Sequence, residues 1–236
     1  MHHSFIDKYS NLNSIVHRID SRAKILSFFS LLLIVVLTPP SSLFKFYLYF
    51  LLIFAVIIIS RVPPGFVFRR SLIVLPFAFA ITFFNLVTGS MDMVMFIAIS
   101  AKAWLSALSM IVLVSTTPFA HLMKGLERLG VPRVIVMVMS FMYRYLFILA
   151  DEAMRIGQAR DCRSSGGNLR LRLRTVGSII GVLFIRSYER GERVYAAMAS
   201  RAFDGSVRTL DKFTMGKKDA AFFSLILIPS IIIFIT

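Results

Sequence analysis

The sequence is poor in the residues on which most enzymes and metal proteins depend. It has one cysteine, Cys162, so it can form no internal disulfide, and only 12 acidic residues in 236. The spacings typical of phosphate-binding loops, zinc peptidases and serine hydrolases are absent from it. We therefore expect no catalytic residue, no metal ligands and no cofactor in this chain.

Charged residues of both signs are also scarce, at 17% of the chain, whereas apolar residues make up 57%. The mean hydropathy is +0.78. Soluble chains have about 45–50% apolar and about 25% charged residues, so a soluble domain could not bury this much apolar surface. The composition predicts an all-α membrane protein with several spans.

Five apolar runs are candidate spans, because a helix of about 20 apolar residues crosses the hydrocarbon core. Four of them lie within residues 25–116, and the last lies within residues 219–236. Their apolar parts cover residues 25–37, 43–60, 71–88, 91–116 and 220–235. Residues 1–24 are polar and basic, and we expect them on the cytoplasmic side.

The distribution of Lys and Arg orients these spans by the positive-inside rule. Residues 1–24 and 61–70 are basic, whereas the turns at 38–42 and 88–92 hold no Lys or Arg, and residues 117–218 hold 18 of the 27. This alternation predicts a cell-membrane protein with the N-terminus inside, the C-terminus outside and most loops cytoplasmic. Because the net charge of +15 follows the loops, we do not expect nucleic acid as a partner.

Residues 117–218 are expected to form a cytoplasmic coupling module of three helices separated by glycine and proline. The second helix is predicted over residues 133–163 and the third over 171–203. Residues 133–150 are apolar enough to be a sixth span, and this alternative stays open. A stripe on the third helix is expected to pack on the second; it consists of Phe184, Tyr188, Tyr195 and Met198.

Two helix ends in this module carry an arginine beside a small residue, with a glycine a few positions later. They contain Ala159, Arg160, Asp161 and Gly166, and Ser200, Arg201, Ala202 and Gly205. A small residue lets a helix end enter a narrow groove, where a guanidinium can bind a carboxylate or backbone carbonyls. The alternative is two ordinary helix C-termini whose cations complement the macrodipole.

Lys102 lies deep in the fourth predicted span, too far from either end to reach water easily. One interpretation is a contact with a partner subunit inside the membrane. The other is an internal bond to the backbone or to Asn85.

The chain resembles the transmembrane T component of energy-coupling factor transporters, most closely the cobalt and nickel branch. The similarity is carried by "DKYSNLNSIVHRIDSRAKIL", "STTPFAHLMKGLERLGVP", "YRYLFILADEAMRIGQARDCR" and "SYERGERVYAAMASRAFDG". That family has two Ala-Arg-Gly signatures, at the ends of two coupling helices that dock into grooves on ATPase subunits. By resemblance, Arg160 and Arg201 are the signature arginines; Asp161 and Ala202 stand where glycine is usual, and Ser200 stands for alanine.

The resemblance implies a non-catalytic coupling subunit of an ATP-driven importer. Its partners would be two ABC-type ATPases and a small membrane subunit that captures the substrate, with cobalt or nickel as the transported ion. Three alternatives stay open: a T component for a vitamin such as biotin, a stand-alone secondary transporter, and a membrane-bound enzyme.

Overall fold

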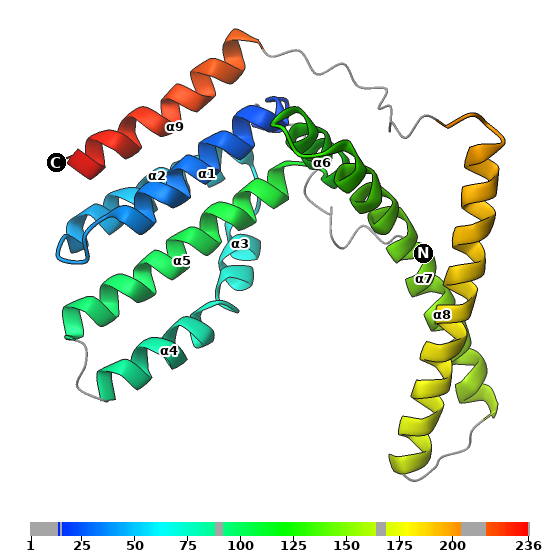
Figure 1. The fold of residues 1–236 in the computed structure, drawn as a ribbon. Helices are drawn as coiled ribbons and strands as arrows, with labels where there is room; N and C mark the ends of the chain where they lie inside the picture. Colours follow the sequence, from blue (N-terminus) through cyan, green and yellow to red (C-terminus); the bar gives the residue numbers. More distant parts are fainter. Residues whose placement is uncertain (1–13, 15, 88–91, 164–168, 204–215, 236) are drawn as a thin grey trace. The chain divides into compact units, whose positions relative to one another are not determined.

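The computed structural model describes residue 14 and residues 16–87, 92–163, 169–203 and 216–235 (Figure 1). All regular structure in these residues is helical, which confirms the predicted all-α class. The helices are α1 (Ser21–Leu37), α2 (Leu43–Ser60), α3 (Pro64–Ser71), α4 (Leu75–Val87), α5 (Met93–Thr116), α6 (Phe119–Arg128), α7 (Arg133–Arg163), α8 (Leu169–Ala199) and α9 (Lys217–Ile235). They fall into two compact units, residues 1–130 with 211–236 and residues 131–210, which we describe separately.

Helix ends agree with the predictions where proline, glycine or a cap marks them. The bounds of α2 and α7 are those predicted, and α5 and α9 begin within three residues of the predicted positions. α1 begins at Ser21 because Asp20 caps it, accepting a hydrogen bond from the Arg22 N–H (3.0 Å). A side-chain acceptor at this position satisfies a free N–H of the first turn.

The predicted third span, residues 71–88, is divided in the structure. α3 ends at Ser71, and three turn residues separate it from α4. Pro76 has no N–H to donate, and the Leu72 carbonyl instead accepts from the Leu75 N–H three residues ahead (3.3 Å). The 13 residues of α4 extend only about 20 Å, which is less than the hydrocarbon thickness of about 30 Å.

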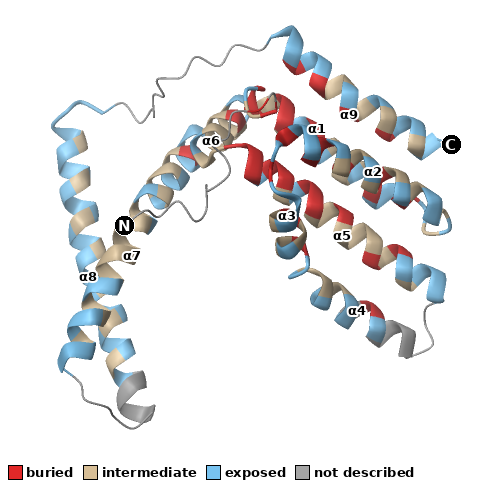
Figure 2. Ribbon diagram, turned by 180° about the vertical axis from the view of Figure 1, so that it is seen from behind, coloured by how far each residue is buried: buried red, intermediate tan, exposed pale blue. Residues whose placement is uncertain are grey.

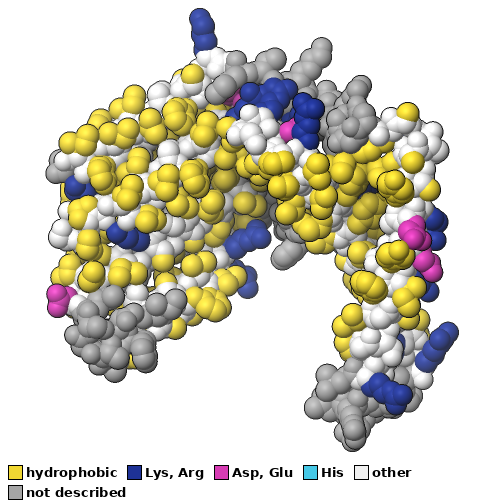
Figure 3. Space-filling model, viewed as in Figure 1, with side chains coloured by type: hydrophobic (Ala, Val, Ile, Leu, Met, Phe, Trp, Pro, Cys, Tyr) yellow, Lys and Arg dark blue, Asp and Glu magenta, His cyan; other side chains and the backbone are white. Residues whose placement is uncertain are grey.

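The hydrophobic core of the first unit forms around α1 and α5, against which α2, α4 and α9 pack (Figures 1 and 2). Its centre includes Phe28 and Leu31 of α1, Leu108 of α5 and Ile226 of α9, each at most 1% exposed. Apolar side chains also cover the outside of these helices (Figure 3). An outer surface of this kind suits lipid, because lipid chains are as apolar as the side chains facing them.

Three lysines of the first unit donate to carbonyls in the last turns of neighbouring helices. Lys24 Nζ bonds the Thr116 carbonyl at the end of α5 (3.0 Å), and Lys45 Nζ bonds the Phe234 carbonyl at the end of α9 (2.9 Å). Lys102 Nζ bonds the Val36 carbonyl at the end of α1 (2.8 Å). The last carbonyls of a helix lack partners within it, and a cation also complements the negative end of the helix dipole.

Lys102 finds its acceptor well inside α5, far from the first residue of that helix, because α1 is shorter than α5. α1 has 17 residues and α5 has 24, or about 26 and 36 Å. The two helices run antiparallel, since Lys24 meets the end of α5 and Lys102 meets the end of α1. α1 therefore ends at the level of Lys102, about 14 Å along α5 from Met93.

A buried polar junction joins the beginnings of α1 and α9. The Asp20 N–H donates to Asp219 Oδ1 (2.8 Å), and the Gly216 N–H donates to Asp219 Oδ2 (2.7 Å). Burial, and then the nearby Asp219 carboxylate, raise the pKa of Asp20. The two helices thus begin at one level, although their first residues are almost 200 positions apart in the sequence.

α6 crosses α1 at a glycine. A Cβ on Gly125 would lie 2.9 Å from Ser21 Oγ and 3.0 Å from Ile25 Cδ1. This close approach needs a residue without a side chain. α6 thus belongs to the first unit by its contacts, although its sequence falls within the predicted module of residues 117–218.

Four of the described helices are both long and apolar enough to cross a membrane, namely α2, α5, α7 and α9. The number of spans and their orientation stay predictions. The inclusion of α7 keeps open the alternative of a sixth span over residues 133–150.

The second unit is a pair of long helices, α7 and α8, that cross near their middles. Glu152 of α7 and Arg186 of α8 form an ion pair at the crossing. The prediction that the aromatic stripe of α8 packs on α7 is wrong: Phe184, Tyr188 and Tyr195 are 70%, 63% and 71% exposed. Two straight helices that cross diverge on both sides of the crossing, so the described residues far from the crossing lie away from the other helix.

Candidate functional site

The first predicted arginine, Arg160, lies in the last turn of α7, which ends three residues later at Arg163. Its Nε and Nη2 donate to Oδ1 of the adjacent Asp161, at 2.9 and 2.6 Å. The Arg160 side chain is 35% exposed and that of Asp161 is 66% exposed. An ion pair this open to solvent is weak, so the guanidinium can exchange Asp161 for another acceptor at little cost.

The second arginine, Arg201, follows the end of α8 at Ala199 and is exposed. The backbone closes there with two hydrogen bonds of 3.1 Å, from the Ala202 N–H to the Ala199 carbonyl and from the Phe203 N–H to the Met198 carbonyl. This pair of bonds defines a Schellman motif, which satisfies the last carbonyls of a helix. Among the described residues, the Arg201 guanidinium has no hydrogen bond or ion pair, so the motif presents a free cation.

Ala202 occupies the position of this motif that usually holds glycine. Its φ is +52°, in the left-handed region. Alanine reaches this region only at a cost of about 1 kcal/mol, because its Cβ approaches the following carbonyl oxygen. Ala202 therefore adopts the backbone conformation that glycine favours, at the position where the resemblance leads us to expect glycine.

The structure describes some, but not all, of the other residues predicted at the two helix ends. Ala159, beside Arg160, and Ser200, beside Arg201, are exposed, as a small residue entering a groove would be. Gly166 and Gly205 lie outside the described residues, so their role in ending the helices stays a prediction.

The two arginines lie on opposite sides of the crossing of α7 and α8. Arg160 is eight residues, or about 12 Å, beyond Glu152 along α7, and Arg201 is 15 residues, or about 22 Å, beyond Arg186 along α8. The C-terminal ends of the two helices point to opposite ends of the pair (Figure 1). The geometry therefore presents two separate cationic helix ends.

Lys102, the possible intramembrane partner contact, has an internal acceptor in the Val36 carbonyl. Asn85 is described only as part of α4, so the structure does not place its side chain. Whether Lys102 also meets another subunit stays a prediction.

Sequence reasoning missed the buried junction of Asp20, Lys24 and Asp219. Lys24 is 1% exposed, and its Nζ also donates to the His17 carbonyl (3.2 Å). The available signal was the spacing of Asp20 and Lys24, which puts both side chains on one face of the first turn of α1. In the described residues no group of three or more His, Cys, Asp or Glu side chains could hold a metal ion.

The comparisons with known proteins point to one family. Its profile, CbiQ, described as a cobalt transport protein, matches residues 12–211. An uncharacterised protein of Methanocaldococcus jannaschii is 35% identical over 102 residues, which are 43% of this chain and 38% of that protein. The cobalt transport protein CbiQ of Rhodobacter capsulatus is 35% identical over 98 residues, 42% of this chain and 40% of that protein.

A longer alignment extends over nearly the whole sequence. The energy-coupling factor transporter transmembrane protein EcfT of Bacillus subtilis is 23% identical over 260 aligned positions, which cover 98% of this chain and 97% of that protein. The two more similar relatives are matched over less than half of their own length. With its family profile matched from residue 12 to residue 211 and its all-helical membrane fold, the chain belongs to the CbiQ family, the transmembrane components of energy-coupling factor transporters of the cobalt and nickel branch.

Proposed function

We propose that this chain is the coupling subunit of an ATP-driven ion importer. It links two ABC-type ATPases to a small membrane subunit that captures the substrate. It carries no catalytic residue itself, and ATP hydrolysis takes place in the partner subunits. It lies in the cell membrane with its N-terminus and most loops in the cytoplasm.

The observation that carries this proposal is the pair of arginine-bearing helix ends. Arg201 is exposed on a closed helix end, and Arg160 holds only the weak pair with Asp161. Because the ends lie on opposite sides of one helix crossing, they suit two separate acceptor grooves rather than one. ATP-driven movement of two docked ATPases would then turn α7 and α8 against each other about the Glu152–Arg186 contact.

The exposed apolar faces of α7 and α8 support a further contact. Val134, Val138 and Met142 of α7 are 65%, 55% and 52% exposed, and they follow one helix face. An apolar surface of this extent marks an interaction site. We assign it to the substrate-capturing subunit and the adjacent lipid.

The transported ion is proposed from the names of relatives. Two are named cobalt transport protein CbiQ, and one from Lactiplantibacillus plantarum is named nickel permease LarQ. We propose cobalt or nickel as the transported ion, and the capturing subunit as the protein that binds it.

The test is co-purification and ion uptake with Arg201→Glu and Arg160→Glu variants. Each reversal of charge should lower ATPase retention at least tenfold, and the double variant should abolish uptake while the chain stays in the membrane. Arg193→Glu is the matched control, because Arg193 is an exposed α8 arginine with only a 3.8 Å pair to Glu189; it should leave both readouts near wild type.

Two results would overturn the proposal. One is unchanged uptake in the Arg160→Glu, Arg201→Glu double variant. The other is uptake by vesicles that contain this chain alone, which would identify a stand-alone transporter.

A further inference from the structure

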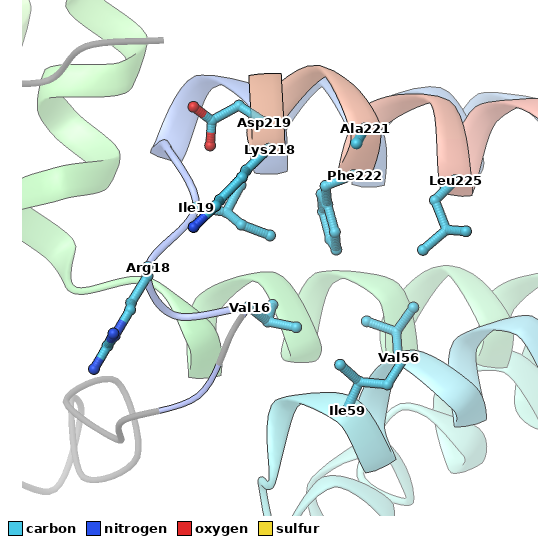
Figure 4. A pocket seen from close by; sticks show the side chains of 10 residues that line it. All are labelled: Val16, Arg18, Ile19, Val56, Ile59, Lys218, Asp219, Ala221, Phe222 and Leu225. Carbon is cyan, nitrogen blue, oxygen red and sulfur yellow. The ribbon is translucent and has the colours of Figure 1, made fainter. Parts of the chain in front are cut away.

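The first unit contains a cavity of about 490 Å³ between the C-terminal half of α2, the first turns of α9 and the segment before α1 (Figure 4). Its walls are mainly apolar and include Val16, Ile19, Val56 and Phe222. These four side chains are at most 9% exposed. The cavity therefore has a packed floor, although it is open to the outside, where Arg18, Ile59 and Leu225 are exposed.

The cavity has a cationic end and an apolar end. Lys218 points toward Ile19 at one end, where Arg18 also lies with its side chain extending outward from the cavity, and Phe222, Leu225 and Val56 line the other end (Figure 4). Both cations are exposed, and neither has a hydrogen bond or ion pair to another described residue. Two unpaired cations at one end of an apolar cavity favour an anionic group there.

The one acidic residue in the lining does not neutralise these cations. Asp219 points away from the apolar end (Figure 4), and its two oxygens accept the N–H groups of Asp20 and Gly216. As part of that junction, Asp219 is buried, with 6% of the residue exposed. The cationic end is therefore left for an external ligand.

The apolar end opens toward the outer surface of helices α2 and α9. Ile59 of α2 and Leu225 of α9 line the cavity but are 47% and 61% exposed. Both helices are long and apolar enough to span a membrane, and an apolar outer surface of this kind suits contact with lipid. A ligand with an anionic head and an apolar tail can thus enter sideways from the bilayer.

We propose that this cavity binds one anionic phospholipid from the leaflet next to the start of α9. The phosphate lies against Arg18 and Lys218, and part of an acyl chain lies along Phe222, Val56 and Leu225. Basic pockets between membrane helices select anionic head groups in this way. The bound lipid joins α2 to α9 and fills the space between them.

The test uses the detergent-purified full chain and its thermal stability in titrations with phosphatidylglycerol and phosphatidylcholine. Phosphatidylglycerol should stabilise the wild type at lower concentration than phosphatidylcholine. The double variant Arg18→Gln, Lys218→Gln should weaken phosphatidylglycerol binding about 25-fold, or about fivefold for each cation. Lys217→Gln is the matched control, because Lys217 is an exposed neighbour that does not line the cavity.

A second variant tests the apolar end. Leu225→Trp fills the cavity from an exposed position, and it should weaken phosphatidylglycerol binding without lowering the stability of the lipid-free chain. Soluble glycerol phosphate should not stabilise the wild type. Equal binding of the two lipids, unchanged binding in the double variant and in Leu225→Trp, or equal stabilisation by glycerol phosphate would each overturn the proposal.

Discussion

The two units differ in what their cationic and apolar side chains contact. In residues 1–130 and 211–236, three lysines bond carbonyls at the ends of neighbouring helices, and apolar side chains form a core. In residues 131–210, the signature arginines face outward or hold a weak pair, and among the described residues only Val136 is a buried apolar side chain. The first unit uses these lysines and apolar side chains in its own packing, whereas the second leaves most of its apolar and cationic side chains exposed.

This difference predicts what substitutions in each unit should change. A unit with a closed core holds its shape by itself, because burying apolar surface is the main favourable term in folding. A pair of helices with little shared surface gains its stability from what binds it. Substitutions in the first unit should therefore act on stability, and those in the second on assembly.

The largest expected effect comes from removing a buried lysine. Lys24→Met leaves the His17 and Thr116 carbonyls without a donor and removes a cation that attracts the Asp20 carboxylate. We expect a loss of about 3 kcal/mol or more in unfolding free energy, measured by thermal unfolding in detergent. The same substitution at exposed Arg193 should leave the unfolding temperature unchanged; equal losses at the two positions would contradict the comparison.

A glycine in each unit gives a second, smaller contrast. Gly125→Val places a side chain against Ser21 and Ile25, whereas nothing lies within 4 Å of a Cβ on Gly181 in α8. The change at Gly125 should cost about 1–3 kcal/mol and loosen α6 from α1, seen as faster amide exchange in α6. Gly181→Val should be neutral in the isolated chain, so a comparable loss there would show that α8 is packed.

The smallest effect should come from the end of α8. Ala202→Gly removes the left-handed strain of alanine and should stabilise the helix end by about 1 kcal/mol, slowing exchange of the Phe203 amide. Ala199→Gly, at the last helical residue, is the control and should destabilise the helix by up to about 1 kcal/mol. Faster exchange at Phe203 in the Ala202→Gly variant would contradict the Schellman geometry.

Local signals in the sequence were sufficient to predict where most of the helices lie. The bounds of α2 and α7 and the all-helical class follow from hydropathy and from proline and glycine positions. Hydropathy alone does not show the division between Ser71 and Leu75, because it does not show where backbone hydrogen bonds shift around Pro76. The sequence indicates that Arg160 and Arg201 lie at or near helix ends, as they do, and their role as signatures stays a prediction. The left-handed conformation of Ala202 could not be predicted, since alanine does not normally signal it.

Contacts between distant parts of the chain could not be predicted. The bond from Asp20 to Asp219 joins residues 199 positions apart, and that from Lys45 to Phe234 joins residues 189 apart. The aromatic stripe of α8 was misassigned for a related reason. Periodicity identifies an apolar face, but it does not say whether the chain itself or another molecule covers that face.

The lysine-to-carbonyl bonds restrict how the first unit can move. A slide of α1 along α5 by one residue would displace an acceptor by about 1.5 Å and break the Lys24 and Lys102 bonds together. Lys45 opposes the same displacement between α2 and α9. These bonds therefore oppose sliding within two helix pairs, α1 against α5 and α2 against α9.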